Sequence, residues 1–377
     1  MAYISLGNID KNLITIFVGC VICFLNRLLN QYDGTLLFKN VIMTVFCIST
    51  SRFLTLFPYI ILKIRLKQAK NYINNQFINQ NALKSPQKKI EEIVKGKWLY
   101  IILSSIIFLI QLFFLVVSFH IKTNAWIWYI LFSSIFYYFI FKVQLHKHHY
   151  LSIILIILIG LIIDLVTESL QKELVNDLLL LTMKFLKEIF FSLYNVLAKY
   201  VIEKKYASVY EFSFYVGLIN LILLIIFSIL DHYYFGLYNY TDYFNNFNNN
   251  ELLVMLGVII SQLGINLTTL FTTKNYSPCH VFIIFVFGQL AYYIKFDGVS
   301  IIVIICLILI LFLSLIFNEI IEINIWGLSH NTKKNILNRV QKEEYLFNYK
   351  TGSFDSEIEN DEYLIDVNES EHSKEDE

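Results

Sequence analysis

Residues 177–205 read DLLLLTMKFLKEIFFSLYNVLAKYVIEKK, a long apolar run that polar side chains interrupt at regular intervals. At 3.6 residues per helical turn, this spacing places five of them on one narrow stripe of a helix. They are Lys184, Glu188, Ser192, Asn195 and Lys199, with Lys187 at the edge of the stripe. A helix of this kind inside a membrane needs protein or water against its polar face.

The stripe predicts a site within the membrane. A charge at bilayer depth costs on the order of 3 kcal/mol on insertion scales, so intramembrane ionisable residues mark functional sites by default. Two structural alternatives stay open. Lys184 and Glu188 are spaced i,i+4 and could pair with each other, and Lys199 could extend its ammonium to the membrane surface. Because snorkelling does not account for Lys184, Glu188 and Asn195 together, we expect a ligand cavity.

The composition is that of a polytopic membrane protein. Of the 377 residues, 56% are hydrophobic and 16% are charged, against roughly 25% charged residues in soluble domains. The mean hydropathy is +0.58. The formal net charge is zero and gives no nucleic-acid footprint. All five cysteines fall in or beside apolar segments, so we expect neither a disulfide framework nor a metal or other cofactor.

The fold class predicted is all-α, with about ten transmembrane helices arranged as two inverted five-helix repeats. A spanning helix needs about 20 mostly apolar residues, and nine spans are the main alternative to ten. The second segment contains Pro58, which should kink or end its helix. The ten candidate segments lie near residues 12–30, 35–62, 98–119, 125–142, 150–166, 178–202, 209–230, 251–273, 278–294 and 299–320.

The predicted organisation has four parts. A cytosolic N-terminus covers residues 1–11, and the first repeat covers 12–166 with a basic cytosolic loop at 63–97. The second repeat covers 178–320, and a cytosolic tail covers 321–377. The start of the tail suits a membrane-surface helix. From about residue 353 it carries eleven acidic residues and should be disordered.

Orientation follows from lysine and arginine, which concentrate in cytoplasmic loops. Alternate loops differ strongly in their number of basic residues, and both termini fall on the basic, cytosolic side. The loop 231–250 has no Lys or Arg and should face the lumen or the exterior. Its Asn239-Tyr240-Thr241 triplet predicts glycosylation at Asn239. The membrane is either the plasma membrane or an endomembrane of the Golgi, ER or vacuole.

A short internal similarity supports two repeats. LNRLLN at residues 25–30 ends the first predicted helix, and YNVLAK at 194–199 lies at the corresponding place of the sixth. Asn26 aligns with Asn195, and Asn30 falls opposite Lys199. An odd number of helices per half gives the halves opposite orientations. The first half also places Arg27, Lys39 and Arg52 at helix depth, and the structural alternative for each of them is an interfacial anchor.

Enzyme motifs are lacking. The HKHH cluster, with His146, His148 and His149, has no partner clusters to hold a di-iron centre and is better interpreted as a solvated basic loop. No Gly-rich phosphate loop and no Gly-x-Ser-x-Gly motif occur. We therefore expect no catalytic residues and no enzyme, with a membrane-embedded enzyme as the third-ranked alternative.

Three features resemble the drug/metabolite transporter superfamily, which includes nucleotide-sugar transporters and EamA-type permeases. They are the ten helices with cytosolic ends and two stretches, NVLAKYVIEKKYASVYEFSFYVGLIN (195–220) and NYSPCHVFIIFVFGQL (275–290). These stretches look like the helix six to seven junction and the Ser-Pro start of helix nine. FNEIIEINIWGLSHNTKKNI (317–336) is similar to the segment after helix ten in protist members. The Gly-Ala-Leu-Asn-Lys motif of GDP-mannose carriers is not found.

The resemblance implies a secondary transporter of the solute-carrier type with alternating access around a central cavity. We expect the cavity to be lined by Lys184, Glu188, Ser192, Asn195 and Lys199 of helix six and by Asn26, Arg27 and Asn30 of helix one. Cations outnumber Glu188, so the solute should be a small polar metabolite, anionic or phosphorylated as nucleotide sugars are. The expected partners are this solute and membrane lipids, a homodimer is left open, and the alternative function is a non-transporting receptor or scaffold.

Overall fold

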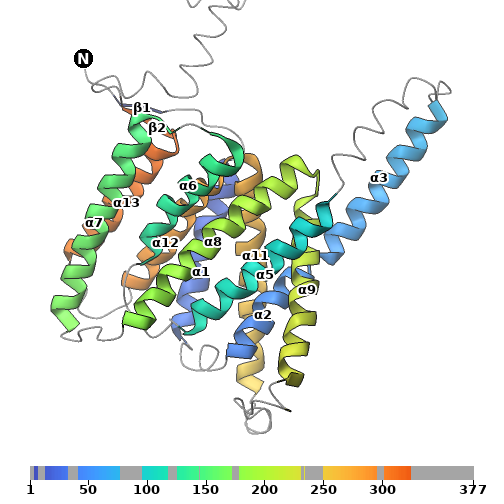
Figure 1. Ribbon diagram of the computed structural model, residues 1–377, viewed down its shortest axis with the longest axis horizontal. Helices are drawn as coiled ribbons and strands as arrows, with labels where there is room; N and C mark the ends of the chain where they lie inside the picture. Colours follow the sequence, from blue (N-terminus) through green and yellow to red (C-terminus); the bar gives the residue numbers. More distant parts are fainter. Residues whose placement is uncertain are drawn as a thin grey trace, which may run out of the picture. The chain divides into compact units, whose positions relative to one another are not determined.

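The computed structural model describes residues 4–6, 13–32, 41–76, 96–117, 125–143, 145–171, 178–230, 233, 249–294 and 301–323. These residues form α-helices, two 3-10 segments and one small sheet (Figure 1). The first part of the chain contains β1 (Ile4–Leu6), α1 (Leu13–Tyr32), α2 (Val41–Phe53), α3 (Leu56–Gln76), α5 (Lys97–Val117), η2 (Ala125–Ile127), α6 (Trp128–Phe141) and α7 (Lys147–Gln171). The second part contains α8 (Leu178–Lys204), α9 (Val209–Leu230), α11 (Asn249–Asn275), η4 (Pro278–His280), α12 (Val281–Ile294), α13 (Ile301–Phe317) and β2 (Ile321–Ile323).

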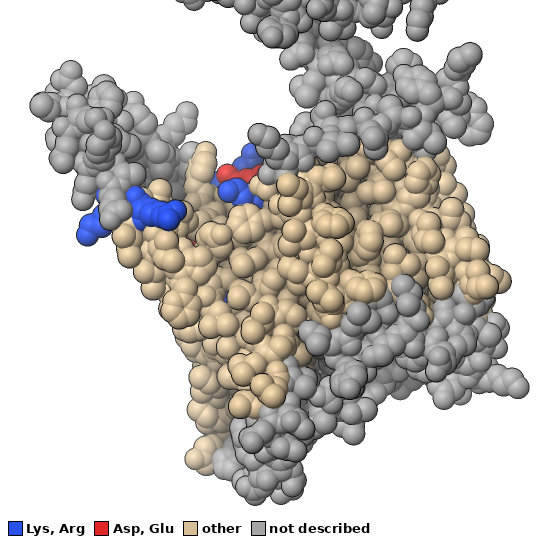
Figure 2. Space-filling model, turned by 180° about the vertical axis from the view of Figure 1, so that it is seen from behind, with Lys and Arg blue, Asp and Glu red and all other residues tan. Residues whose placement is uncertain are grey.

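The helices identify a multi-pass membrane protein. Five helical stretches of the described chain are long and apolar enough to cross a bilayer: Met43–Lys67, Lys97–Leu115, Lys147–Val166, Val209–Leu230 and Met255–Asn275. Large apolar side chains such as Phe17, Phe139 and Ile260 are more than 60% exposed, as a lipid-facing surface requires. Figure 2 shows a broad uncharged face, with charged side chains confined to its upper part and to the region of α3.

Each predicted apolar segment contains a helix, and the second is interrupted as its proline predicts. Pro58 has no N–H to donate to the carbonyl of Leu54, and its ring crowds that carbonyl. The chain turns at Leu54 and Thr55, between α2 and α3. The Thr55 hydroxyl donates to the Arg52 carbonyl over 2.6 Å, which satisfies a carbonyl at the end of α2.

Two expectations at the ends of the helices need correction. The basic loop was expected to begin at residue 63, but α3 continues to Gln76, because Lys, Arg, Gln and Ala are good helix formers outside a membrane too. The N-terminal segment and the start of the tail also form a sheet, which an all-α prediction omits. Strands β1 and β2 pair antiparallel, with Ile4 opposite Ile323. The rest of the predicted tail and residues 77–95 of the predicted basic loop lie outside the described residues.

The helices pack in a few extensive pairs (Figure 1). α8 packs against α5 and α6, while α1 packs against α11 and α12. α2 packs against α9, and α7 packs against α13. One apolar core surrounds Tyr194 and Phe212 between α5, α8 and α9, and a second surrounds Phe282 between α6, α7, α12 and α13.

A glycine allows α2 and α9 to approach closely. A Cβ atom at Gly217 of α9 would lie 2.5 Å from the backbone nitrogen of Phe53 and 2.8 Å from the Cβ of Arg52. Both distances are shorter than real Cβ contacts. Small residues permit this kind of close backbone packing between membrane helices, and here the contact fixes the end of α2 that carries Arg52.

Candidate functional site

A cavity of about 210 Å³ lies among α1, α2, α5, α6, α8, α11 and α12. One water molecule needs roughly 10–15 Å³ of such space, so the cavity can hold a small metabolite. Its walls combine aromatic and aliphatic side chains with three charged residues. The charged and polar lining residues are Arg52, Lys187, Glu188, Asn26, Thr44, Ser51, Gln111, Gln262, Asn266, Thr269 and Gln289.

Arg52 is a buried cation in the wall of this cavity. It is 5% exposed, and its guanidinium donates a hydrogen bond to the Tyr194 hydroxyl. The guanidinium carbon lies 3.7 Å from the centre of the Phe108 ring, which is a close cation–π contact. Its Nε has no hydrogen-bond partner within the described chain, and no ion pair there involves Arg52.

Its charge is therefore balanced by two aromatic rings and a hydroxyl instead of a carboxylate. A buried charge is costly unless it is paired. The five donors of a guanidinium suit a carboxylate or phosphate group. The alternative interpretation of Arg52 as an interfacial anchor does not fit its burial. The close α2–α9 contact at Gly217 keeps it inside the bundle.

Lys187 and Glu188 form the second charged element of the wall. Their ammonium and carboxylate are in direct contact, with side chains 17% and 3% exposed. From the sequence, Lys184 was the alternative partner considered for Glu188. In the structure the close contact of Glu188 is with Lys187, and Lys184 is half-buried and does not line the cavity. The four-carbon chain of a lysine can cross the 100° between adjacent helix positions. The wall thus carries two cations and one carboxylate among its described residues.

The rest of the α8 stripe faces the protein interior. Glu188, Ser192, Asn195 and Lys199 are all buried. The Ser192 hydroxyl bonds the carbonyls of Glu188 and Tyr129 at 2.8 and 3.2 Å. The Asn195 amide donates to the Phe191 carbonyl at 3.0 Å. Neither Ser192 nor Asn195 lines the cavity, so their observed contacts are those of helix packing.

Lys199 lies away from the cavity wall, at the end of α11. Its ammonium donates to the carbonyls of Tyr276, Thr273 and Lys274 at 2.7, 3.0 and 3.4 Å. It also pairs with Glu203 of its own helix at 2.5 Å. The last carbonyls of a helix lack partners within it and attract cations. Lys199 therefore caps α11 and does not belong to the residues that line the cavity.

The first helix contributes Asn26 to the cavity wall. Its amide oxygen accepts a hydrogen bond from Ser261 of α11 at 2.6 Å. The side chains of Arg27 and Asn30 lie outside the described residues, as does the predicted glycosylation site Asn239. Of the predicted site residues, the cavity wall thus contains Asn26 of helix one and Glu188 of helix six.

Several polar wall residues were not predicted. Gln111 Oε1 and Asn266 Oδ1 are buried acceptors without a hydrogen-bond partner in the described chain, and the Asn266 amide donates to Ser213 at 2.7 Å. Such acceptors can receive hydroxyl or amine donors of a ligand. A signal for Arg52 was present in the run STSRFLT at 49–55, which concentrates small polar side chains around one cation.

The histidine cluster was interpreted as a solvated loop, and this is wrong for His148. His148 is 4% exposed and its Nε2 lies 3.2 Å from Glu319 Oε1. The loop is short, and α7 begins at Lys147, so His148 packs under the end of α13 instead of facing water.

Comparison with known proteins gives no family. No protein-family model matches the sequence, and no curated protein shows significant sequence similarity to it.

Proposed function

We propose that the chain is a secondary transporter of the drug/metabolite type that moves a small anionic metabolite by alternating access. The observation that carries the proposal is Arg52, a buried guanidinium without a carboxylate partner in the described chain that lines a cavity between helices. Charge-assisted hydrogen bonds from a guanidinium to carboxylate or phosphate are strong and geometrically specific. Phosphorylated metabolites, including nucleotide sugars, present such a group together with hydroxyls for Gln111 and Asn266.

The pattern of helix contacts supports two related halves. The proposed first half consists of five elements in chain order: α1, α2 with α3, α5, α6 and α7. Their counterparts in the second half, in the same order, are α8, α9, α11, α12 and α13. Exchanging the halves turns the α1–α12 contact into α8–α6, and the α1–α11 contact into α8–α5. It turns α2–α9 and α7–α13 into themselves. Each of these pairs packs together, which is what a two-fold relation between inverted repeats requires.

Alternating access also needs helices of both halves around the ligand. The cavity wall includes α1, α2, α5 and α6 from the first half and α8, α11 and α12 from the second. A ligand held there would contact both halves at once, so a rocking motion of one half against the other could expose it to either side of the membrane. A receptor or scaffold has no need for such a two-sided wall.

Transport assays on Arg52 variants test the proposal. Full-length protein in liposomes should exchange at least one of inorganic phosphate, a sugar phosphate, a nucleotide sugar or a dicarboxylate against the same unlabelled anion. Arg52→Gln should reduce this exchange about 10- to 150-fold, since hydrogen bonds to charged groups contribute about 1.5–3 kcal/mol. Arg52→Lys keeps the charge but loses the planar fork and should fall between the two.

The exposed Lys204 at the end of α8 provides the control. Lys204→Ala should exchange at the wild-type rate. Thermal stabilisation by an anion without any exchange would favour the receptor alternative. Folded protein that neither exchanges nor is stabilised by any of these anions would contradict the proposal.

A further inference from the structure

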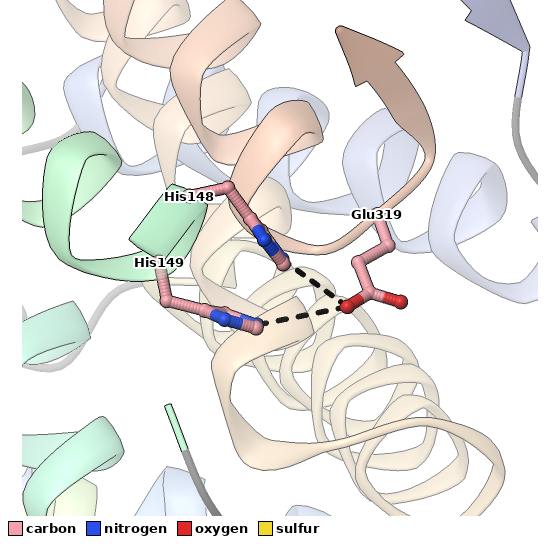
Figure 3. A group of neighbouring side chains, drawn as sticks. All are labelled: His148, His149 and Glu319. Carbon is pink, nitrogen blue, oxygen red and sulfur yellow. Dashed lines mark hydrogen bonds and ion pairs between the residues drawn. The ribbon is translucent and has the colours of Figure 1, made fainter. Parts of the chain in front are cut away.

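Three side chains that can bind metals, from two segments about 171 residues apart in the sequence, meet at the start of α7 and the end of α13. His148 Nε2 and His149 Nε2 lie 3.2 and 4.0 Å from the same carboxylate oxygen, Oε1 of Glu319. One possible ligand atom from each residue lies within 4.8 Å of those of the other two. Figure 3 shows both imidazole rings pointing toward that oxygen.

The backbone at Glu319 is unusual for a glutamate. Its φ of +57° is left-handed, a conformation that favours glycine at the end of a helix. Two hydrogen bonds hold the turn: Ile320 N–H donates to the Leu315 carbonyl and Glu319 N–H donates to the Ile316 carbonyl, both at 3.0 Å. Strained residues of this kind concentrate at functional sites, and the turn directs the carboxylate at the two histidines.

We propose that His148, His149 and Glu319 bind a divalent transition metal, and we take Zn²⁺ as the ion because two imidazoles and one carboxylate are an established zinc ligand set. Zinc bonds of about 2.0–2.2 Å in tetrahedral geometry place ligand atoms about 3.3–3.5 Å apart. The separation of 3.2 Å fits, and the separation of 4.0 Å needs a shift of about half an ångström, within the reach of a glutamate side chain. The ion would join α7 to α13, the equivalent helices of the two proposed halves.

The surroundings of the cluster suit an ion with one position left open. His148 is almost fully buried, whereas the side chains of His149 and Glu319 are 15% and 20% exposed. Water can therefore reach one side and complete the coordination. The His146 ring lies 5.8 Å from that of His149 and 6.1 Å from that of His148, between centres, and could supply a fourth ligand after a change of rotamer.

The hydrogen bond to His149 predicts a change of tautomer on metal binding. The backbone N–H of His146 donates to His149 Nδ1 at 3.1 Å, so the neutral ring carries its proton on Nε2, next to Glu319. A metal at Nε2 needs the lone pair of that atom. The proton must therefore move to Nδ1, which breaks the bond from the His146 N–H, and the ring stays neutral with no net release of a proton.

Zinc titration of the full-length protein in detergent tests the site. The protein is purified through a tag without histidine, stripped with a chelator and titrated with ZnCl₂. Wild-type protein should retain about one zinc per chain after desalting and melt several degrees higher with zinc. Loss of a ligand should weaken zinc binding at least tenfold, as removal of even the outer partners of metal ligands does.

Two ligand variants and one control keep the result interpretable. Glu319→Gly removes the carboxylate and relieves the left-handed strain, so it should fold and yet show no zinc response. His148→Ala tests the buried ligand. His280→Gln changes a histidine outside the cluster, whose ring bonds Ser277, and should respond to zinc like wild-type. Zinc retention by Glu319→Gly and His148→Ala equal to wild-type, or no retention by wild-type, overturns the proposal.

Discussion

Replacing Lys199 by methionine should destabilise the fold, although the sequence alone places Lys199 in a wet cavity where its removal would leave folding intact. Methionine keeps the length of the side chain and removes the ammonium. In the structure, Lys199 is 3% exposed, and its ammonium donates hydrogen bonds to three carbonyls at the end of α11. Its loss strands these carbonyls and leaves Glu203 unpaired.

The magnitude follows from the burial of each partner. A buried acceptor that loses its donor costs about 1–3 kcal/mol. The ammonium has three protons, and one of them points to Glu203, so two serve the carbonyls and together contribute at least about 2 kcal/mol. Glu203 is 36% exposed and water can solvate it, so the ion pair contributes at most about 1 kcal/mol. Lys199→Met should therefore lower the free energy of unfolding by about 3 kcal/mol.

Denaturant titration in mixed micelles measures this free energy, and two variants of the same helix end serve as references. Glu203→Gln should cost at most about 1 kcal/mol, because it removes only the ion pair. Lys204→Ala removes an exposed lysine one turn further along and should change stability by less than about 0.5 kcal/mol. Wild-type stability in Lys199→Met, together with a loss of anion exchange, would refute the capping role and return Lys199 to the cavity.

Two further predictions concern the packing around the cavity. Gly217→Ala should lower the free energy of unfolding by about 1–3 kcal/mol, because its Cβ would overlap the backbone of Phe53. Gly257→Ala, on the open side of α11, is the control and should be neutral or stabilising. Equal effects of the two variants in melting experiments would contradict the close contact. Lys187→Met should lower the free energy of unfolding by about 3–5 kcal/mol, because it leaves the buried Glu188 carboxylate without its partner. The double variant Lys187→Met with Glu188→Leu should recover most of this stability in the same denaturant titration. If Lys184 were the partner of Glu188, the double variant would not recover it.

The positions of the helices follow from the sequence because the constraints on them are local. A bilayer requires about 20 apolar residues per span, and this length is readable in any window of the chain. The break near Pro58 and the start of η4 at Pro278, where proline occupies the first helical position, are equally local. The antiparallel pairing of β1 with β2 is not, since it joins residues more than 300 positions apart.

Partners of the charged residues could not be predicted for the same reason. The period of a helix shows that Glu188 and Lys199 share a face, and both are indeed buried. It does not show what lies opposite. Lys199 meets carbonyls 74–77 residues further along the chain, and His148 meets a carboxylate 171 residues away. The HKHH cluster lacked a carboxylate in its own neighbourhood and was therefore interpreted as a solvated loop.

The fate of each buried cation depends on which unpaired group its helix neighbours supply. Lys199 lies beside the end of α11 and donates its hydrogen bonds to carbonyls that have no partner within their own helix. Lys187 lies beside Glu188 and is neutralised within its own helix. Arg52 lies against the rings of Phe108 and Tyr194. These rings stabilise its charge only weakly, and its Nε has no hydrogen-bond partner within the described chain. The α8 stripe therefore acts mainly to hold the bundle together, and the proposed anion site depends on the end of α2, in the opposite half of the chain.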